Sequence, residues 1–417
     1  MQLVEQHVID RHDPRYAAID AVAFASKNLY NAANYEMRQA FIHEWRFLSY
    51  NQLDKLMQSH EAYQALPAKV AQWVLKGLVN NWKSFKEARE RYQRDPSQFR
   101  GRPRLPKYKH KTDGRNLLVY TTQAISTPEL RKGVIQPSQL GITVKTKQDP
   151  ATIKQVRIVP KHGFYVVEVV YEKEPVQANV NPSLYAGLDP GVTNVAAIAS
   201  NKAGFVPRLV NGRPIKACNQ WYNKRLKQLK KKLPKRDRER VTRQMERITN
   251  KRNRRIDHDM HTASRRIIDL LVQEGIGTLI IGKNDGWKQE VEMGRQNNQA
   301  FVAIPHARFI DMLTYKAELV GIRVVLTEES YTSQASFLHR DEMPVYDPNR
   351  TEKPRFSGTR KGRFYYTNDG RRLHADVNGA YNMIRKVTSD AFQAEDVADA
   401  IVVHPVRIVR TKSQNMA

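Results

Sequence analysis

The sequence predicts a protein of mixed class, in which a β-rich region and a helical segment precede an α/β domain. From residue 183 to about 387, apolar strand-like runs alternate with helical patterns, which is typical of an α/β sheet. Between 115 and 175, short β-rich runs such as NLLVYTT and GFYVVEVVYEKE are separated by turn residues, which favours an antiparallel sheet or a small barrel. From about 14 to 95, apolar residues recur every three or four positions, which predicts helices.

The N-terminal elements suggest how these regions are joined. Residues 2–9, QLVEQHVI, alternate in polarity and predict a strand that could pair with the later β-rich runs. The helical segment would then interrupt a β domain. A basic connector follows, FRGRPRLPKYKHK from Phe99 to Lys111, in which Pro103 and Pro106 exclude a helix. Its cations and Tyr108 suit contact with phosphates and bases, and an ordinary linker is the alternative.

The α/β region contains recognisable strands and helices. Strands are predicted in LYAGLDPG, VAAIAS, GTLIIG and IRVVLTEES. One long helix is predicted near 219 to 273, another in HARFIDMLTYKAELVG, and a third that begins in HADVNGAYNMIRK. The tail contains a short strand candidate, AIVVHPVRIV.

The charge balance points to a polyanionic partner. The 417 residues include 70 Lys and Arg against 42 Asp and Glu, a net charge of +28. Such self-repulsion is relieved by nucleic acid, and a solvated basic surface is the alternative. The single Cys218 excludes an internal disulfide and a zinc site built from several thiolates. No run resembles a signal peptide or a membrane span, so an intracellular, soluble protein is expected.

Basic residues concentrate in two places. Besides the connector, residues 224–256 are predominantly basic around Pro234, which favours a phosphate-binding groove over a solvated helical hairpin. Asn31, Asn34, Tyr35, Trp82 and Lys83 of the helical segment are weaker candidates, and core packing is the favoured role for the aromatic ones. The candidate nucleic-acid contacts are Arg102, Arg104, Lys107, Tyr108, Lys109, Arg225, Lys251, Arg252, Arg254, Arg255 and Arg360.

Carboxylates recur at strand ends of the α/β region. Asp189 follows a strand on a Gly-Pro turn, Glu328 and Glu329 end the strand RVVLTEES, and Asp376 begins a helix. Edges of this kind are where sites are built in α/β sheets. Mg²⁺ prefers oxygen ligands, and two such ions about 4 Å apart can activate water and stabilise the leaving oxygen of a phosphodiester. Taken singly, these residues could instead be a turn former, a solvated strand end and a helix cap.

At these residues the sequence resembles the RuvC-type, RNase H-like nuclease domain, and more closely the TnpB family of transposon-encoded RNA-guided nucleases, near compact type V CRISPR effectors. GLDPGVTN resembles the first RuvC motif and ADVNGAYNMIRK the third, while NKRNRRIDHDMHTASRRIIDLL, FRGRPRLP-KYK and SYTSQAS resemble other family segments. The resemblance implies a wedge β-barrel interrupted by a helical recognition lobe. Its implied parts are the first barrel strand (1–12), the helical lobe with the connector (13–110), the rest of the barrel (111–180), a first RuvC-like part (181–332), a target-nucleic-acid-binding insert (333–375) and a last RuvC-like part with the tail (376–417).

Two departures from the family pattern matter. The second RuvC motif ends its strand in glutamate, whereas TLIIGKND has Gly282 there. A relocated glutamate, Glu329 in preference to Glu328, is a reasonable substitute, because a neighbouring strand end can reach the same metal and alternating faces let only one of the two point inward. The insert at 333–375 lacks the family's four zinc-binding cysteines, so no structural zinc is expected. Aromatic side chains are expected to order it instead: Phe356, Phe364, Tyr365 and Tyr366.

The resemblance implies an Mg²⁺-dependent, RNA-guided DNA endonuclease of a prokaryotic cytoplasm, associated with the nucleoid when bound to DNA. Asp189, Glu329 (or Glu328) and Asp376 would hold two Mg²⁺ ions. Guide RNA and double-stranded target DNA would be its partners, and protein side chains would read a short flanking motif. The alternative raised by Gly282 is a catalytically inactive, guide-bound DNA-binding protein that acts as a repressor. A guide-free resolvase or transposase would leave the N-terminal regions without a role.

Overall fold

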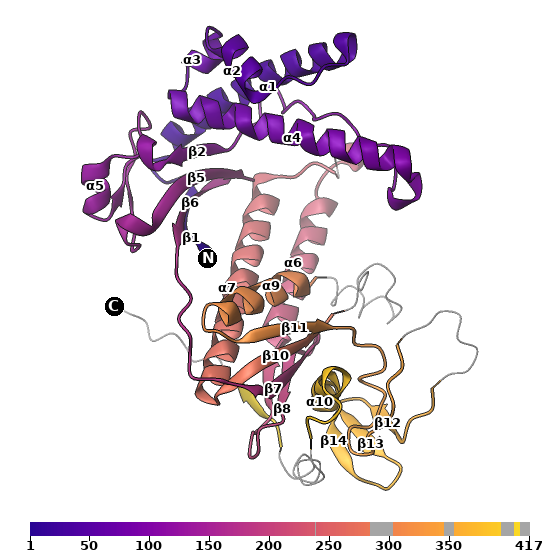
Figure 1. Cartoon of the computed structure of the whole chain (residues 1–417). Coiled ribbons are helices and arrows are strands. Elements are labelled where there is room, and N and C mark those ends of the chain that lie inside the picture. Colours follow the sequence, from indigo (N-terminus) through magenta and orange to yellow (C-terminus); the bar gives the residue numbers. More distant parts are fainter. Residues whose placement is uncertain (238, 284–302, 346–353, 393–403, 409–417) are drawn as a thin grey trace. The chain divides into compact units, whose positions relative to one another are not determined.

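The computed structural model describes residues 1–237, 239–283, 303–345, 354–392 and 404–408. The chain divides into two units, residues 1–173 and 174–417, and each has its own hydrophobic core (Figure 1). Within the described ranges, no helix combines the length and the apolar character needed to cross a lipid bilayer.

The first unit contains an antiparallel sheet of four strands in the order β1-β6-β5-β2. The N-terminal strand β1 pairs with β6 along its whole length, from Gln2 opposite Glu172 to Asp10 opposite Phe164. The predicted pairing of the opening strand with the later β-rich runs is therefore confirmed. The strands are β1 (Gln2–Asp10), β2 (Leu118–Thr121), β5 (Ile153–Lys161) and β6 (Phe164–Glu172).

Of the two predicted alternatives, an antiparallel sheet or a small barrel, the described residues form the sheet, which stays open with β1 and β2 as its outer strands. Four strands are too few to curl into a closed cylinder. The run GITVKT does not join the sheet either, since its β4 (Val144–Lys145) pairs with β3 (Val134–Ile135) in a separate ribbon. Left-handed backbone at Gln139 and Gly141 turns the chain back on itself between these two strands.

The predicted helical segment contains four helices that share one core. They are α1 (Tyr16–Glu44), α2 (Tyr50–Met57), α3 (Glu61–Gln64) and α4 (Ala68–Arg94). Trp82 of α4 is fully buried in this core, and its indole N–H donates to Asn34 of α1 at 2.9 Å. Trp82 and Asn34 therefore stabilise the helices and are not available to read a duplex.

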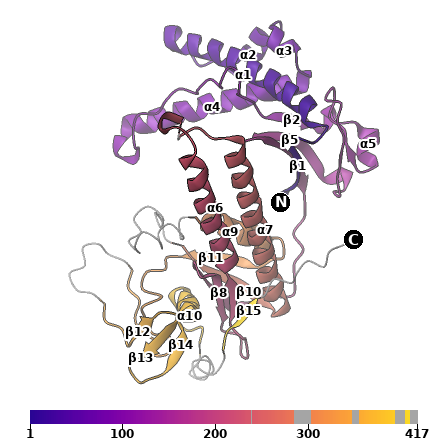
Figure 2. The same cartoon turned by 180° about the vertical axis from the view of Figure 1, so that it is seen from behind.

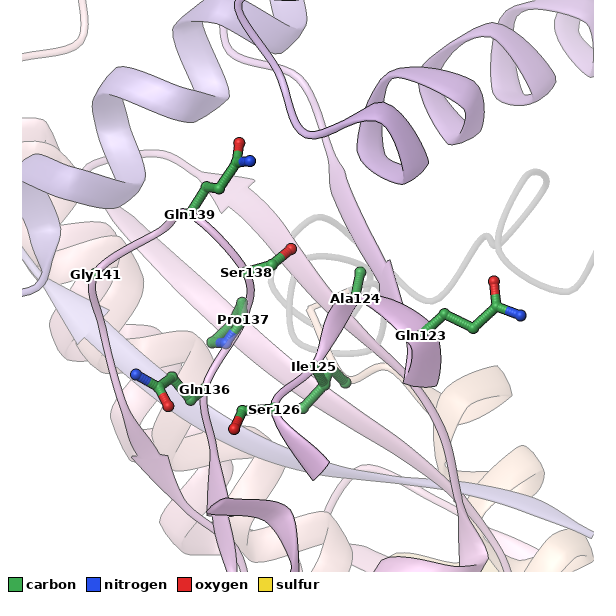
Figure 3. A pocket seen from close by; sticks show the side chains of 9 residues that line it. All are labelled: Gln123, Ala124, Ile125, Ser126, Gln136, Pro137, Ser138, Gln139 and Gly141. Carbon is green, nitrogen blue, oxygen red and sulfur yellow. The ribbon is translucent and has the colours of Figure 1, made fainter. Parts of the chain in front are cut away.

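A pocket of about 290 Å³ lies in the first unit between residues 123–126 and residues 136–141 (Figure 3). The short elements around it are α5 (Thr127–Arg131) and the β3–β4 ribbon. Glutamine, serine and small apolar side chains line the pocket, and its lining has no charged group. This chemistry does not suit a phosphate.

The second unit is built on a mixed sheet in the order β11-β10-β7-β8-β9-β15. Strand β8 runs antiparallel to its neighbours β7 and β9, whereas β10 runs parallel to both β7 and β11, and β15 runs parallel to β9. The predicted α/β sheet is thus present, with one antiparallel strand among parallel ones. Its strands are β7 (Asn181–Pro190), β8 (Asn194–Ser200), β9 (Arg208–Asn211), β10 (Ile276–Gly282), β11 (Arg323–Thr327) and β15 (Val406–Ile408).

Helices cover both faces of this sheet. On one face, Ala186 and Leu188 of β7 pack with α7 (Arg243–Gln273) and α9 (His306–Glu318). On the other face, Ile280 of β10 and alternate residues of β8 pack against α10 (Ala375–Val387). Because side chains alternate along a strand, the residues between those of the first set point towards α10.

The single long helix predicted near 219 to 273 is wrong, because the structure has two helices there, α6 (Arg213–Lys231) and α7. Pro234 lies between them, and proline inside a helix removes a hydrogen bond and clashes with the preceding turn. Figure 2 shows α6 and α7 side by side as a long pair.

The insert folds as a small antiparallel sheet of β12 (Gly358–Lys361), β13 (Phe364–Thr367) and β14 (Arg372–His374). Tyr365 is fully buried, and its hydroxyl donates to the carbonyl of Gln334 at 2.7 Å. Phe356 packs against Tyr331, and Phe364 against Tyr366. Aromatic packing therefore orders the described part of the insert.

Candidate active site

Three parallel strands end at one edge of the mixed sheet. Leu188 of β7 pairs with Ile281 of β10, and Gly282 of β10 pairs with Thr327 of β11. Asp189 follows Leu188 directly, and Glu328 and Glu329 follow Thr327. The parallel pairing therefore brings residues that are more than a hundred positions apart to the same edge.

Two glycines allow helix α10 to lie directly on β7. A Cβ atom on Gly187 would stand 2.0 Å from the carbonyl oxygen of Ala380, which leaves no room for any side chain. A Cβ atom on Gly379 would stand 2.9 Å from Oδ2 of Asp189. This close approach brings the first turn of α10, with Asp376, beside the end of β7.

Glu329 occupies the space that Gly282 leaves open. A Cβ atom on Gly282 would lie 2.8 Å from Oε2 of Glu329 and 2.4 Å from the methyl carbon of Met383. The carboxylate of Glu329 therefore lies where a longer side chain at position 282 would begin. Glycine at 282 and glutamate at 329 are sterically complementary.

Glu328 faces a different partner. Its carboxylate forms an ion pair with Lys386 of α10, and it accepts a hydrogen bond from the backbone N–H of Ser330 at 2.9 Å. Burial alone would raise the pKa of Glu328, but the hydrogen bonds from Lys386 and Ser330 outweigh it and lower that pKa. Of the two adjacent glutamates, Glu328 is thus neutralised within the protein.

Asp376 is oriented by two side chains from different elements. Nδ2 of the buried Asn194, at the start of β8, donates to Oδ2 of Asp376 at 2.9 Å. Nη2 of Arg360, from β12 of the insert, donates to Oδ1 of Asp376 at 2.8 Å. The insert therefore reaches the candidate site through one guanidinium.

The carboxylates of this edge act on one another electrostatically. The pKa of Asp189 is raised well above its ordinary value, mainly by burial and then by the negative charges of Glu329 and Asp376. Burial, followed by the charge of Glu328, raises the pKa of Glu329 to about 7. Asp189 and Glu329 keep partial contact with solvent, although protein atoms surround them closely enough to disfavour the charged forms.

A divalent cation would fit the chemistry of this donor set. The candidate ligands Asp189, Glu329 and Asp376 offer only carboxylate oxygens, which Mg²⁺ prefers. The raised pKa values of Asp189 and Glu329 show that these two side chains lack a compensating positive charge. Within the described ranges, however, no three acidic, histidine or cysteine side chains already stand in the arrangement of a metal site. Arg360 supplies part of the positive charge by holding one oxygen of Asp376.

A ladder of buried amides connects Glu329 to the helix that carries Asp376. Asn378 and Asn382, one turn apart on α10, each donate to the carbonyl of Ala335 at 2.8 Å. Asn382 also donates to the carbonyl of Thr332 at 2.9 Å. The turn that follows Glu329 is therefore fixed to α10. Sequence reasoning missed these residues, although two asparagines four positions apart among the apolar residues in the middle of a helix are a detectable signal.

His306 fixes the turn on the other side of Asp189. It is buried at the start of α9, and its Nε2 lies 3.1 Å from the carbonyl oxygen of Gly191. Since a carbonyl oxygen only accepts, this ring nitrogen carries the proton. The Asp189 turn is thereby held against the opposite helical layer.

The candidate contacts of the connector differ in exposure. Arg102, Arg104, Lys107 and Tyr108 are exposed. Lys109 is only partly exposed, its ammonium lies 4.9 Å from the ring centre of Tyr30, and burial lowers its pKa. Four residues of this segment can therefore meet a partner, and Lys109 is mainly directed into the unit.

On the helical pair, Lys251, Arg254 and Arg255 are exposed, and Arg225 is partly exposed. Arg252 is partly exposed and has partners within the unit. Its guanidinium donates to Asn219 of α6 at 2.7 Å and to the carbonyl of Ala303 at 3.0 Å. Arg252 therefore ties α7 to α6 within the unit.

Two family models match the second unit and its surroundings. OrfB_IS605, described as a probable transposase, matches residues 168–288, and the Cas12f1-like TNB domain matches residues 306–383. The first range includes Asp189 and Gly282. The second includes Glu329, Arg360 and Asp376.

One curated relative and one solved structure extend the comparison. The CRISPR-associated endodeoxyribonuclease Cas12f2 of Micrarchaeota archaeon (strain CG1_02_47_40) is 26% identical over 235 residues, which are 54% of this chain and 41% of that protein. The chain thus matches less than half of that relative's length. A cryo-EM structure of a Cas12f1-sgRNA-target DNA complex has a TM-score of 0.51 and 13% identity, and the match covers 88% of this chain and 82% of the other. That likeness shows a shared fold. The chain is therefore similar, over these ranges, to transposon-encoded TnpB-type proteins and to compact type V CRISPR effectors.

Proposed function

We propose that this protein is an RNA-guided DNA endonuclease that cleaves target DNA, next to a short flanking motif, by two-metal-ion hydrolysis. The observation that carries the proposal is the position of Glu329, whose Oε2 lies 2.8 Å from where a side chain on Gly282 would begin. The glutamate missing from the second motif is thereby replaced by one from the neighbouring strand end. The negative charge of Glu329 also helps to raise the pKa of Asp189, and a bound divalent cation would offset this electrostatic cost.

The ligands would be Asp189, Glu329 and Asp376. Bound Mg²⁺ would supply an activated water and stabilisation of the leaving oxygen. Asn194 holds Oδ2 of Asp376, so the other oxygen is the one that changes partner when substrate binds. The amide ladder of Asn378 and Asn382 keeps Glu329 at a fixed position from α10. Preorganisation of this kind matters because small displacements of ligands reduce the rate.

Arg360 would bind the phosphate next to the cleaved bond. Its guanidinium already lies 2.8 Å from Asp376, and the side chain is 42% exposed. A planar guanidinium can donate two parallel hydrogen bonds to a phosphate as readily as to a carboxylate. Substrate binding would thus exchange the contact with Asp376 for one with DNA.

Guide RNA and double-stranded DNA are the proposed partners. The net charge of +28 and the exposed cations of the connector and of α7 support a polyanionic ligand. The related complex is described as containing an sgRNA and target DNA. In proteins of this kind base pairing reads the target sequence, and the gene could belong to a transposon or to a compact CRISPR system.

The first experiment identifies the RNA. The protein is expressed with its native flanking DNA and purified, and the RNA bound to it is sequenced. One enriched RNA with a constant scaffold and a short variable end would support the proposal and provide the reagent for a cleavage assay. A mixture of cellular RNAs would contradict it in favour of general polyanion binding.

The second experiment compares the adjacent glutamates in that assay. Glu329→Gln should reduce cleavage by about 1,000-fold, because about 4 kcal/mol of transition-state stabilisation is lost with a metal ligand. Glu328→Gln is the matched control, and it should retain cleavage within about tenfold because Glu328 pairs with Lys386. Guide-dependent DNA binding without any cleavage by the unaltered protein would favour the inactive, repressor-like alternative.

A further inference from the structure

One face of α1 is bonded to the main chain of the basic connector. The residues involved are Lys27, Asn31, Asn34 and Arg38, which share a face because they are spaced by four, three and four positions. Lys27 donates to the carbonyl of Lys111 at 2.7 Å, and Asn34 and Arg38 donate to the carbonyl of Pro106 at 3.1 Å and 2.6 Å.

Asn31 makes a two-point bond in the middle of this face. Its Nδ2 donates to the carbonyl of Lys109 at 2.9 Å, and its Oδ1 accepts from the N–H of the same residue at 2.8 Å. The side-chain amide therefore pairs with one residue of the connector as a neighbouring strand would. Both main-chain groups of Lys109 are satisfied by one asparagine.

The lengths of the two segments match. Eleven helical positions from Lys27 to Arg38 span about 17 Å at 1.5 Å per residue. Five extended residues from Pro106 to Lys111 span about 17 Å at roughly 3.4 Å per residue. The connector can thus run antiparallel to α1 in register with all four side chains. A linker that merely joined two elements would not need such a match.

The inward and outward sides of the connector differ in chemistry. Leu105 packs against the helical core, and Lys27 is almost fully buried, which lowers its pKa. The exposed side chains are Arg102, Arg104, Lys107 and Tyr108, and the guanidinium of Arg38 lies 4.6 Å from the ring centre of Tyr108. Cations and one aromatic ring therefore project from a backbone that is already held.

A fixed backbone changes what binding costs. Ordering one residue of a flexible chain costs about 1–2 kcal/mol at room temperature. In this connector that cost is met during folding, because side chains of α1 supply hydrogen-bond partners for its main chain. Pro103 and Pro106 lack an N–H group, so the connector could not pair fully with a neighbouring β-strand. A ligand then meets cations at fixed spacing.

We propose that residues 102–111 form a preorganised strap, held to α1 at Pro106, Lys109 and Lys111, that binds a phosphodiester backbone, and that Asn31, Asn34 and Arg38 are its positioning residues. This inference rests on the proposed function only for the class of partner, nucleic acid. It reassigns Asn31 and Asn34 from candidate readers of a duplex to supports of the strap. RNA and DNA share the phosphodiester chemistry, and the experiment below separates them.

The experiment measures affinity against salt concentration for the full-length protein with single-stranded RNA, single-stranded DNA of the same sequence and duplex DNA. Asn31→Ala should weaken binding roughly five- to tenfold while the slope of log affinity against log salt is unchanged, because the phosphate contacts remain and only the ordering is lost. Lys107→Ala should reduce the magnitude of that slope by about 0.7–0.9, because it removes one phosphate contact. The nucleic acid that shows both effects is the strap's ligand.

Two controls keep the result interpretable. Gln39→Ala, on the same helix, removes only a contact with His43 and should change neither quantity. If Asn31→Ala reduces folding, Arg38→Met removes the bond to Pro106 with less disturbance, and hydrogen exchange at the Lys109 amide reports loosening of the strap directly. Unchanged affinity in Asn31→Ala and Arg38→Met would overturn the strap, as would a reduced slope in these variants. If the unaltered protein showed no salt-dependent binding to any of the three nucleic acids, that result would contradict the proposed function instead.

Discussion

The carboxylate edge of the second unit and the connector of the first unit both gather like charges, but they do so in opposite surroundings. At the edge, Asp189 and Glu329 are closely surrounded by protein, and their pKa values rise. On the connector, Arg102, Arg104 and Lys107 project into water. The buried cluster is destabilised by its own charge, whereas water and salt screen the exposed one.

This difference in burial determines what kind of ligand can neutralise each region. A few buried carboxylates can be neutralised only by something small enough to enter, such as a divalent cation or the guanidinium of Arg360. A row of exposed cations is best neutralised by a long polyanion, whose binding is driven by release of counterions. Burial therefore selects an ion at one region, and exposure selects nucleic acid at the other.

The largest expected effect is at the buried region. Asp189→Asn keeps the shape of the side chain but removes a charge, and it should reduce cleavage by about 1,000-fold, equivalent to about 4 kcal/mol. Guide-dependent DNA binding should stay within about twofold, because the exposed cations are unchanged. Cleavage is measured on a labelled target and binding by gel shift. Cleavage that survived in Asp189→Asn would remove this residue from the site.

The next effect is a pH dependence of stability without divalent cations. The folded protein holds the proton of Glu329 more tightly than the unfolded chain, with a pKa of about 7 against 4.5. The contribution of Glu329 to the free energy of unfolding is therefore complete below about pH 4.5. It is lost as the pH rises through about 7, by at most about 3 kcal/mol. Urea unfolding of Glu329→Gln should show a smaller loss and not a complete absence of it, because the raised pKa of Asp189 also makes stability fall as the pH rises. Added Mg²⁺ should reduce the loss in the unaltered protein.

Glu328 is the matched control for that dependence, because its pKa is lowered. The contribution of Glu328 to the free energy of unfolding is present above pH 4.5, the ordinary pKa of a glutamate, and is lost as the pH falls below that value. Glu328→Gln should therefore weaken folding near neutral pH. It should reduce the loss between pH 4.5 and 7 without abolishing it, because burial is the larger cause of the raised pKa of Glu329 and the charge of Glu328 is the smaller one. Equal pH profiles for the two variants would contradict the different surroundings assigned to the two glutamates.

A third effect compares two glycines. Gly187→Ala should destabilise the protein by about 1–3 kcal/mol, because the added carbon would meet the carbonyl of Ala380 at 2.0 Å. Gly77→Ala, in α4 of the first unit, has nothing within 4 Å of the added carbon and should stabilise by about 0.5–1 kcal/mol. Urea midpoints that move in the same direction would contradict the close approach of α10 to β7.

The smallest effect separates two arginines. Arg104→Ala should reduce the salt slope of nucleic-acid binding by about 0.7–0.9 with little change in stability, because Arg104 is exposed. Arg252→Ala should leave the slope unchanged and destabilise folding by about 1–3 kcal/mol, since Oδ1 of Asn219 loses the donor Arg252 and the carbonyl of Ala303 loses one of its two donors. A reduced slope in Arg252→Ala would restore it as a contact.

Several features were predictable because they depend on local patterns. Alternation of polarity predicted β1, helical spacing predicted α1 and α4, and strand ends predicted the positions of Asp189 and Asp376. The single helix near 219–273 was predicted wrongly, and the pattern left open whether the first β region is an open sheet or a barrel. Closure of a sheet depends on pairing between distant strands. Whether one proline ends a long helix or only bends it depends on what the helix packs against.

The choice between Glu328 and Glu329 illustrates the same limit. Both end the same strand, and only α10 distinguishes them, because it brings Lys386 to Glu328 and leaves Glu329 beside Gly282. Likewise, Arg252 and Arg254 look alike in a basic run, yet Arg252 is held by Asn219 of another helix.

By itself the sequence determined the kind of chemistry: a basic protein with carboxylates at strand ends and aromatic residues in place of zinc ligands. These properties are carried by residue type and short spacing. The tertiary structure alone decided which carboxylates meet, which cations face outward and which asparagines hold a backbone. Those outcomes depend on contacts between residues far apart in the chain, and such contacts are fixed by packing and by the register of parallel strands.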